Sequence, residues 1–234
     1  MHHKVTGAAV RQLLSLSHIE LHAEVKLVPR RSLRNDTINE PAEQCRTENM
    51  LEKLKESLER SDVVRFGEYQ YFVHPITDGI PSMDPKVLQE VLDRMLVLGD
   101  FRCDYIVGAE AMAIPLMVPL SLQTGIPYNV VRKRKYGLPG EVSVHQTTGY
   151  SEKELFINGL KKGDRVVIVD DVLSTGGTLK AMVQAFKLMG VTVVDVIIVV
   201  QKTDRLAEME AELGQKIKTL VRVEMRDGKV RVLS

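Results

Sequence analysis

The pattern of hydrophobic and polar positions changes at Met50. From this residue, the segment MLEKLKESLERS places three leucines on one face of a predicted helix, because residues three or four apart are neighbours on a helix surface. The preceding segment, PRRSLRNDTINEPAEQCRTEN, is polar and broken by proline, which is typical of a linker. We therefore expect residues 1–49 to be a poorly ordered, dispensable N-terminal extension, with Met50 as a natural start, and residues 50–234 to form the functional domain.

After Met50, predicted strands and helices alternate. The strands are nearly continuous runs of Val and Ile in YIVG, IPYNVV, DRVVIV and VTVVDVIIVV, and the helices between them lie in AIPLMVPLSLQTG and GGTLKAMVQAFKLMG. Another helix is predicted in MDPKVLQEVLDRMLVLG, with Asp84 as its N-cap, Pro85 at its first position and Gly99 at its end. This alternation predicts an α/β fold with a parallel twisted sheet flanked by helices on both faces.

Three hairpins are also predicted. DVVRF and YQYFV lie on either side of Gly67, and TLVRVEMRDGKVRVL turns at Asp227-Gly228. Between the second and third predicted strands of the sheet, YGLPGEVSVHQTTGYSEKELFI has turn residues at both ends of a polar stretch. We expect this segment to be a long, mobile hairpin or flap.

Composition excludes several classes of protein. With 32 basic and 31 acidic residues, the formal net charge is only +1, so no overall field attracts nucleic acid or a membrane surface. The two cysteines, Cys45 and Cys103, have neither CxxC spacing nor a histidine cluster beside them, which disfavours a disulfide framework or a zinc site. No apolar run reaches the roughly 18 to 20 residues that a membrane helix needs. We expect a soluble, cytoplasmic protein.

One stretch, VVIVDDVLSTGGTLKAMV, carries the candidate chemistry. Asp170 and Asp171 follow a predicted strand, and ligands of open parallel sheets bind at the carboxyl ends of the strands. The glycines and hydroxyls of residues 174–178 then open a helix, which is a suitable cradle for a phosphate. Because two carboxylates accept hydrogen bonds from a diol, a phosphorylated sugar is the ligand that we expect.

This stretch has two other interpretations. Any strand can end in Asp-Asp, and a hydrophobic run ending in acid also resembles the magnesium-binding strand of P-loop ATPases. The sequence contains neither GxxxxGK[ST] nor GxGxxG, so those nucleotide-binding folds lack their main part.

The thirteen residues VVIVDDVLSTGGT closely resemble the phosphoribosyl pyrophosphate signature of type I phosphoribosyltransferases. The resemblance extends over about Asp62 to Asp204, through HPITDGIPSMDPKVL and VRKRKYGLPGE, which look like segments of adenine phosphoribosyltransferases. As a whole, the chain from Met50 is most similar to the archaeal hypoxanthine/guanine phosphoribosyltransferases. The resemblance implies that residues 50–234 are a phosphoribosyltransferase domain, with a small hood and a flexible flap beside the sheet.

The resemblance also implies an activity. Enzymes of this family transfer 5-phosphoribosyl from phosphoribosyl pyrophosphate to a purine and release pyrophosphate; with hypoxanthine or guanine the product is IMP or GMP, a step of purine salvage. It further implies a homodimer and Mg²⁺ held mainly by oxygens of the ligand and by waters, so no residue is assigned as a metal ligand. The expected partners are the two small-molecule substrates, with no nucleic acid and no membrane.

Site residues are carried over on matching positions. Asp170 and Asp171 would bind the ribose hydroxyls, and the 5′-phosphate would be held by Ser174, Thr175, Gly176, Gly177 and Thr178. The pyrophosphate loop would be Ala109, Glu110 and Ala111, and cationic charge for the pyrophosphate would come from Arg132 and Lys133. An alternative for these two basic residues is a solvated run at a loop entrance.

The chain departs from its family at the groups that handle protons. Met112 stands where adenine enzymes have an arginine in the pyrophosphate loop, and Gly149 stands where they have a catalytic glutamate before the flap tyrosine, here Tyr150. Ser174 stands where mammalian-type hypoxanthine/guanine enzymes have an aspartate base. Glu141, Glu152 and Asp204 are weak substitutes, so no catalytic residue is assigned.

The purine that we expect the protein to prefer is inferred from Lys202. This residue matches a lysine that in hypoxanthine/guanine enzymes donates to the 6-oxo group, and an ammonium has only donors, which disfavours the amino group of adenine. Its alternative is a surface lysine at the end of a strand. Two alternative functions stay open: an adenine phosphoribosyltransferase, and a regulatory protein that senses phosphoribosyl pyrophosphate. For the second, residues 1–49 are neither basic nor long enough for a convincing DNA-binding module.

Overall fold

The computed structural model describes residues 51–67, 69–147 and 152–233. The predicted N-terminal extension, Met50, Gly149 and Tyr150 therefore lie outside the described residues. The helix predicted after Met50 is present as α3 (Glu52–Glu59), and its leucines Leu54 and Leu58 are buried.

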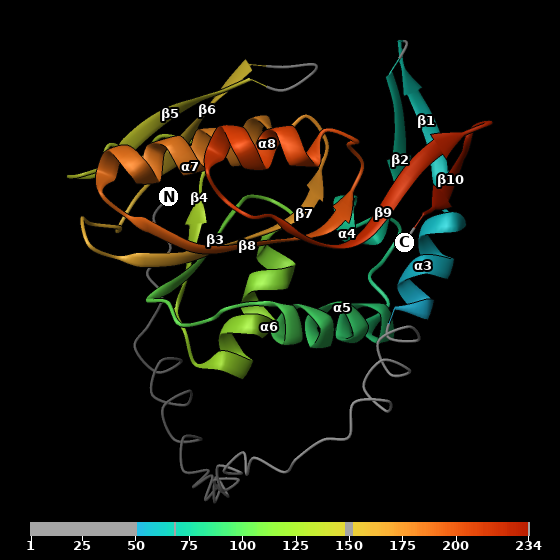
Figure 1. Cartoon of the computed structure of the whole chain (residues 1–234), viewed down its shortest axis with the longest axis horizontal. Coiled ribbons are helices and arrows are strands. Elements are labelled where there is room, and N and C mark those ends of the chain that lie inside the picture. Colours follow the sequence, from blue (N-terminus) through green and yellow to red (C-terminus); the bar gives the residue numbers. More distant parts are fainter. Residues whose placement is uncertain (1–50, 68, 148–151, 234) are drawn as a thin grey trace, which may run out of the picture. The chain divides into compact units, whose positions relative to one another are not determined.

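A six-stranded sheet forms the centre of the described domain (Figure 1). Its order is β10-β9-β8-β7-β3-β4, and all neighbouring pairs are parallel except β9 with β10. The strands are β3 (Tyr105–Ala109), β4 (Tyr128–Val131), β7 (Arg165–Leu173), β8 (Thr192–Gln201), β9 (Lys218–Arg226) and β10 (Lys229–Val232). The predicted α/β fold with a mostly parallel sheet is confirmed.

Helices cover both faces of this sheet, as the near-continuous Val and Ile runs predict. In Figure 1, α7 (Gly177–Met189) and α8 (Leu206–Leu213) lie on one face, and α5 (Pro85–Leu98) and α6 (Ile114–Thr124) lie on the other. Successive side chains of a strand point to opposite faces, so Val167 and Val169 of β7 join one hydrophobic core and Val166 and Ile168 join a second. Both faces of the strand are thereby removed from water.

The helix ends follow the sequence signals at most positions. Asp84 caps α5 by accepting a hydrogen bond from the Lys86 amide at 2.8 Å, and α7 ends at Gly190 in the left-handed conformation. Helix α6 continues through Pro119, so proline does not end it there. The sequence reasoning did not identify α8 or the short helix α4 (Pro75–Asp78).

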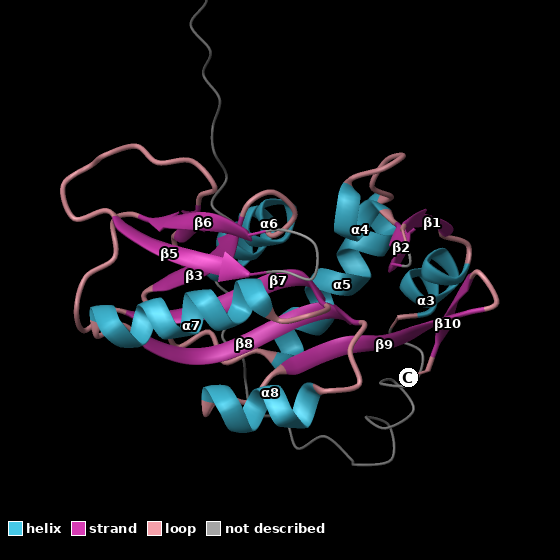
Figure 2. Ribbon diagram, turned by 90° about the horizontal axis from the view of Figure 1, so that it is seen from above, coloured by secondary structure: helices cyan, strands magenta, loops and turns pink. Residues whose placement is uncertain are grey.

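The three predicted hairpins are present. The antiparallel pair β1 (Asp62–Phe66) and β2 (Tyr69–Val73) lies at one end of the domain, and β5 (Val142–Thr147) with β6 (Glu152–Ile157) lies at the other (Figure 2). The third hairpin turns at Asp227 and Gly228, both with positive φ, and β9 also pairs with β8. This last hairpin is therefore part of the main sheet.

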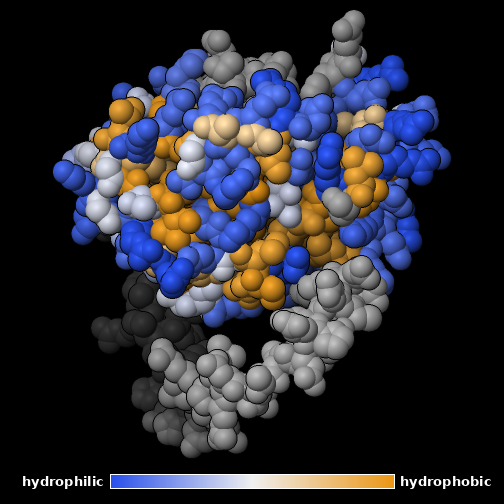
Figure 3. Space-filling model, viewed as in Figure 1, coloured by the Kyte–Doolittle hydropathy of each residue, from blue (hydrophilic) through white to orange (hydrophobic). Residues whose placement is uncertain are grey.

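The surface and helix lengths add two observations. On the face drawn in Figure 3, hydrophobic side chains form several separate patches among polar ones. Within the described ranges, no helix has the length and apolar character needed to cross a membrane.

Candidate active site

The site forms where β7 extends beyond its shorter neighbour. Strand β3 pairs with β7 only as far as Val107 with Ile168, whereas β8 continues to pair with β7 up to Leu173. Asp170 and Asp171 therefore lie inside a longer strand than the sequence suggested, but next to open space on the β3 side. The longer pairing with β8 is what extends β7 beyond the two acids.

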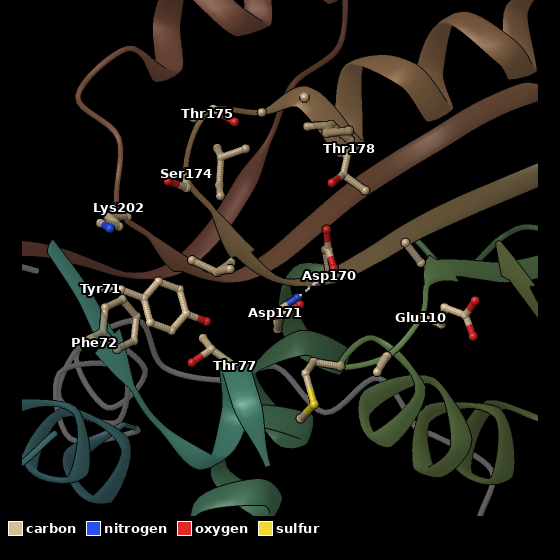
Figure 4. Close-up of a pocket in the computed structure, with 18 of the residues that line it drawn as sticks. Tyr71, Phe72, Thr77, Glu110, Asp170, Asp171, Ser174, Thr175, Thr178 and Lys202 are labelled. Carbon is tan, nitrogen blue, oxygen red and sulfur yellow. Dashed lines mark hydrogen bonds between the residues drawn. The ribbon is translucent and has the colours of Figure 1, made fainter. Parts of the chain in front are cut away.

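A cavity of about 270 Å³ opens at this step in the sheet. Predicted residues that line it are Ala109, Glu110, Ala111, Lys133, Asp170, Asp171, Ser174, Thr175, Gly176, Gly177, Thr178 and Lys202. They come from four different parts of the chain and meet around one space. Figure 4 shows the acid pair in the middle, with Lys202 on one side and Glu110 on the other.

The two central acids share one environment. Asp170 is only 9% exposed, and its carboxylate accepts a hydrogen bond from the Asp171 amide at 3.1 Å. Burial raises the pKa of Asp171 well above its usual value, and the neighbouring charge of Asp170 raises it further. Burial also raises the pKa of Asp170, against the hydrogen bonds from Asp171 and the charge of Lys133. Burial thus disfavours the charged form of both carboxyls, and hydrogen bonds from a diol would favour it.

The loop after these acids is suited to an anion. Its last residue, Gly176, is the N-cap of α7 and has φ 74°, which favours glycine. A Cβ at this position would lie 2.6 Å from the Met209 Sδ, so a larger residue would also require the Met209 side chain to move. The first amides of a helix lack intrahelical acceptors and carry the positive end of the helix dipole. The loop therefore presents amides and hydroxyls to the cavity, as a phosphate site requires.

On the opposite side, the loop after β3 carries Glu110, and the Glu110-Ala111 peptide is cis. The Glu110 carboxylate pairs with the Arg132 guanidinium at 3.2 Å and accepts a hydrogen bond from the Lys133 amide. Arg132 also donates to the Tyr136 hydroxyl at 3.2 Å and does not line the cavity. Of the two predicted cations, the structure brings Lys133 to the cavity and pairs Arg132 with the loop beside it.

Gly108 of β3 allows this loop to lie close to β7. A Cβ on Gly108 would lie 2.6 Å from the Val169 carbonyl oxygen and 2.5 Å from the Ala113 Cβ. Such a contact would push the loop away from the strand that carries the acid pair. Glycine in the predicted strand YIVG is therefore a requirement of the site as well as of the sheet.

Lys202 lies on the other side of the acids and is held by strand β2. Its ammonium donates to the Gln70 carbonyl at 2.8 Å and lies 5.8 Å from the centre of the Tyr71 ring. It lines the main cavity and also a second cavity of about 520 Å³, which extends toward Arg222 and Glu224. The predicted base-recognising lysine thus faces a space beyond the acid pair.

Sequence reasoning missed several residues that line the cavity. Tyr71 and Phe72 come from β2, Thr77 comes from α4, and all three contribute to the wall below Lys202 in Figure 4. The hairpin was predicted, but a hairpin pattern alone does not state which distant strand it will meet. Met112 and Ser174, which mark departures from the family pattern, also line the cavity.

The weak candidates for a proton acceptor lie in different places. Glu141 accepts hydrogen bonds from the Tyr136 and Gly137 amides and from the Asn158 side chain, and the Asn158 bond is the main cause that lowers its pKa. This makes Glu141 a support for the loop rather than a base. Asp204 lines the second cavity, and the Glu152 side chain lies outside the described residues.

A helix N-terminus beside a buried acid pair, at the carboxyl edge of a parallel sheet, is the arrangement that the sequence predicted for this site. The phosphoribosyl transferase domain family matches residues 96–220, more than half of the chain. The chain belongs to this family.

Curated relatives cover most of the chain. A hypoxanthine/guanine phosphoribosyltransferase from Methanobacterium lacus is 51% identical over 183 residues, 78% of this chain and 96% of that protein. An enzyme of the same name from Methanothermobacter thermautotrophicus is 53% identical over 78% of this chain and 95% of its own length. The predicted membership of the family and the likeness to its archaeal hypoxanthine/guanine branch are confirmed.

Solved structures support the fold. An adenine phosphoribosyltransferase from Thermoanaerobacter pseudethanolicus superposes with a TM-score of 0.61 at 23% identity, covering 73% of this chain and 98% of that one. The enzyme from Saccharomyces cerevisiae gives 0.60 at 23% identity, with 74% of this chain and 99% of that one covered. The arrangement of strands and helices is therefore one that this family uses.

Proposed function

We propose that the protein is a purine salvage enzyme that transfers 5-phosphoribosyl from phosphoribosyl pyrophosphate to hypoxanthine or guanine, giving IMP or GMP and pyrophosphate. The observation that carries the proposal is the position of Lys202, which lines the same cavity as the acid pair. An ammonium donates to a 6-oxo group and has no acceptor for an amino group. The archaeal relatives named hypoxanthine/guanine phosphoribosyltransferase share about half of their aligned residues with the chain.

The cavity divides naturally between the parts of the substrates. The ribose hydroxyls would donate to Asp170 and Asp171, and the 5′-phosphate would lie against the loop of residues 174–178 at the start of α7. The base would lie toward Lys202, and the pyrophosphate toward Glu110–Ala111 and Lys133 on the other side of the acids. The reacting carbon of the ribose would then lie between the two groups that exchange.

This arrangement favours catalysis by positioning and charge. The transition state of the family resembles an oxocarbenium ion, so the protein must align base, ribose and leaving pyrophosphate and then stabilise the charge that develops. The acid pair would fix the ring through its hydroxyls, and its negative charge would face the cationic sugar. Lys133 would offset the charge of the pyrophosphate.

Mg²⁺, a homodimer and a cytoplasmic location belong to the same proposal and come from the family resemblance. Among the described residues no three His, Cys, Asp or Glu side chains are grouped so that they could hold a metal ion by themselves, which fits an Mg²⁺ ion held mainly by oxygens of phosphoribosyl pyrophosphate and by waters beside the acid pair. When bound, the ion would neutralise charge on the pyrophosphate. The dimer predicts a particle of about twice the chain mass of 26.3 kDa in light scattering.

The test is Mg²⁺-dependent nucleotide formation with hypoxanthine, guanine and adenine offered separately, in the wild type and in Lys202→Ala. We expect turnover of the two oxopurines, with kcat/KM reduced about 10- to 100-fold in the variant because a donor to the oxo group is lost. The KM for phosphoribosyl pyrophosphate should stay the same. Turnover of adenine alone would assign the adenine activity, and turnover of no base would favour the regulatory alternative.

A further inference from the structure

Asp78, the last residue of α4, collects hydrogen bonds from the wall of the cavity without lining it. Its carboxylate accepts from the Tyr71 hydroxyl at 2.6 Å, from the Thr77 hydroxyl at 2.6 Å and from the His74 amide at 3.0 Å. Tyr71 and Thr77 both line the cavity. One carboxylate therefore ties together the strand and the short helix that form this wall.

Strand β2, which carries Tyr71, is also the strand that contacts Lys202. Strand β2 supplies the Gln70 carbonyl, 2.8 Å from the ammonium, and the Tyr71 ring, whose centre lies 5.8 Å from it. A cation over an aromatic face is attracted by the ring, and a phenol that donates to a carboxylate has a more electron-rich ring. The direction of the ammonium thus depends on where β2 lies.

Strand β2 is fixed by side-chain contacts: Phe72 is buried in the core, and the Tyr71 hydroxyl bonds to Asp78. Within the described part of the chain the strand pairs with β1 alone, in a separate two-stranded sheet. Two-stranded hairpins are only marginally stable by themselves. Asp78, on a helix that contacts β7, links this hairpin to the strand of the acid pair.

Helix α4, which carries Asp78, begins at a buried residue. His74, the N-cap of α4, is 1% exposed. Its Nδ1 accepts a hydrogen bond from the Ile76 amide at 3.1 Å. The proton of the neutral ring is therefore on Nε2, which donates to the Ser57 hydroxyl at 2.9 Å. Ser57 lies in α3 and donates to the Leu54 carbonyl at 2.8 Å. Helix α4 is therefore held against α3, and Asp78 is presented from a fixed position.

We propose that Tyr71 and Asp78 are positioning residues for base recognition: the Tyr71–Asp78 hydrogen bond fixes β2 so that Lys202 points at the oxo group of the purine. The inference rests on the proposed function, because it concerns how Lys202, the proposed base-binding residue, is positioned. Neither residue exchanges protons or bonds with the substrates. Their effect reaches the base through Lys202.

The decisive variant is Tyr71→Phe, which keeps the ring beside Lys202 and removes only the hydroxyl. We expect the KM for hypoxanthine and guanine to rise about 3- to 10-fold, as for the loss of one hydrogen bond. The KM for phosphoribosyl pyrophosphate should not change, and the thermal midpoint should fall by no more than about 5 °C, as for the loss of one hydrogen bond. The matched control is Tyr128→Phe, which removes the hydroxyl of an exposed tyrosine at the start of β4, outside the residues that line the cavity.

A double-mutant cycle tests the route through Lys202. Tyr71→Phe should have no effect on the base in a Lys202→Met background, because the group that it positions is gone. Binding of GMP, measured by calorimetry in the four proteins, gives the same comparison if turnover is too low to measure. Asp78→Asn is the second variant, and it should weaken base binding in the same direction and add little to Tyr71→Phe.

The outcomes separate the inference from the function on which it rests. An active wild type whose base KM is unchanged in Tyr71→Phe overturns the inference alone. The same follows if Tyr71→Phe has an equal effect with and without Lys202, or if it raises the KM of both substrates alike. A wild type that converts no purine and binds no GMP removes the proposed function and the inference with it.

Discussion

The two ends of the cavity are built in different ways. The phosphate end is continuous in sequence: strand, acids, glycine loop and helix follow one another within residues 166–183. The base end is assembled from distant parts, since Lys202 meets a carbonyl oxygen 132 residues earlier in the chain. Under the proposed function, one local motif would bind the ribose and 5′-phosphate of phosphoribosyl pyrophosphate, whereas the purine would be bound through tertiary contacts.

The largest effect should come from the acid pair at the continuous end. Asp171→Asn removes a carboxylate that would accept from the ribose, and we expect kcat/KM to fall about 100-fold or more, or about 3 kcal/mol, with every purine alike. Steady-state kinetics with hypoxanthine and guanine measures it. Asp227→Asn, at the exposed turn between β9 and β10, is the control that removes the same charge. A loss restricted to one base would contradict the division of the cavity.

Gly176 offers a second way to break the continuous end. Gly176→Ala places a Cβ 2.6 Å from the Met209 Sδ, at a φ of 74°. The control, Gly125→Ala, has a φ of 73° but nothing within 4 Å of the added Cβ. Both should lose about 1 kcal/mol of stability from the backbone, and only Gly176→Ala should raise the KM for phosphoribosyl pyrophosphate. Equal kinetics in the two variants would show that Met209 yields without moving the loop.

The stability of the protein should depend on pH through the buried His74, the N-cap of helix α4. Burial lowers its pKa to about 4, so the folded state favours the neutral ring. The unfolded chain takes up a proton near pH 6.5, so the stability that His74 contributes is present above pH 6.5 and is lost as pH falls toward 4, by at most about 3 kcal/mol.

Denaturant unfolding at several pH values measures this contribution as the difference between the wild type and His74→Asn. Asparagine can still cap α4 but does not titrate in this range, so the variant should show a smaller loss on acidification. His145→Gln, at an exposed position in β5, is the control and should behave as the wild type. Identical pH profiles for wild type and His74→Asn would remove His74 as the cause.

The smallest effect is expected from the N-terminal residues. We predict that a chain starting at Met50 keeps the kcat/KM of the full chain with both oxopurines, because the described site is built from residues after it. Activity assays and gel filtration of the two chains side by side measure this. Loss of activity or precipitation of the shorter chain would show that residues 1–49 belong to the working protein.

The sequence predicted the continuous end far better than the assembled one. The candidate chemistry of Asp170 to Thr178 could be predicted because these residues follow one another in the chain. The strand before them and the helix after them placed them at the edge of a parallel sheet. The partners of Lys202 could not be found in this way, because the periodicity of YQYFV predicts a hairpin but not its neighbour in space. Arg132 shows the same limit, since no pattern states that its guanidinium pairs with Glu110.

The separate pairing of β1 with β2 has a consequence for how such enzymes diversify. Because this hairpin, as far as the structure describes it, shares no backbone ladder with the main sheet, its side chains can change without altering the register of the strands that carry the acid pair. A few substitutions in the β1–β2 hairpin could therefore change which purine an enzyme of this kind prefers. The residues proposed to bind the sugar and its phosphates would stay the same.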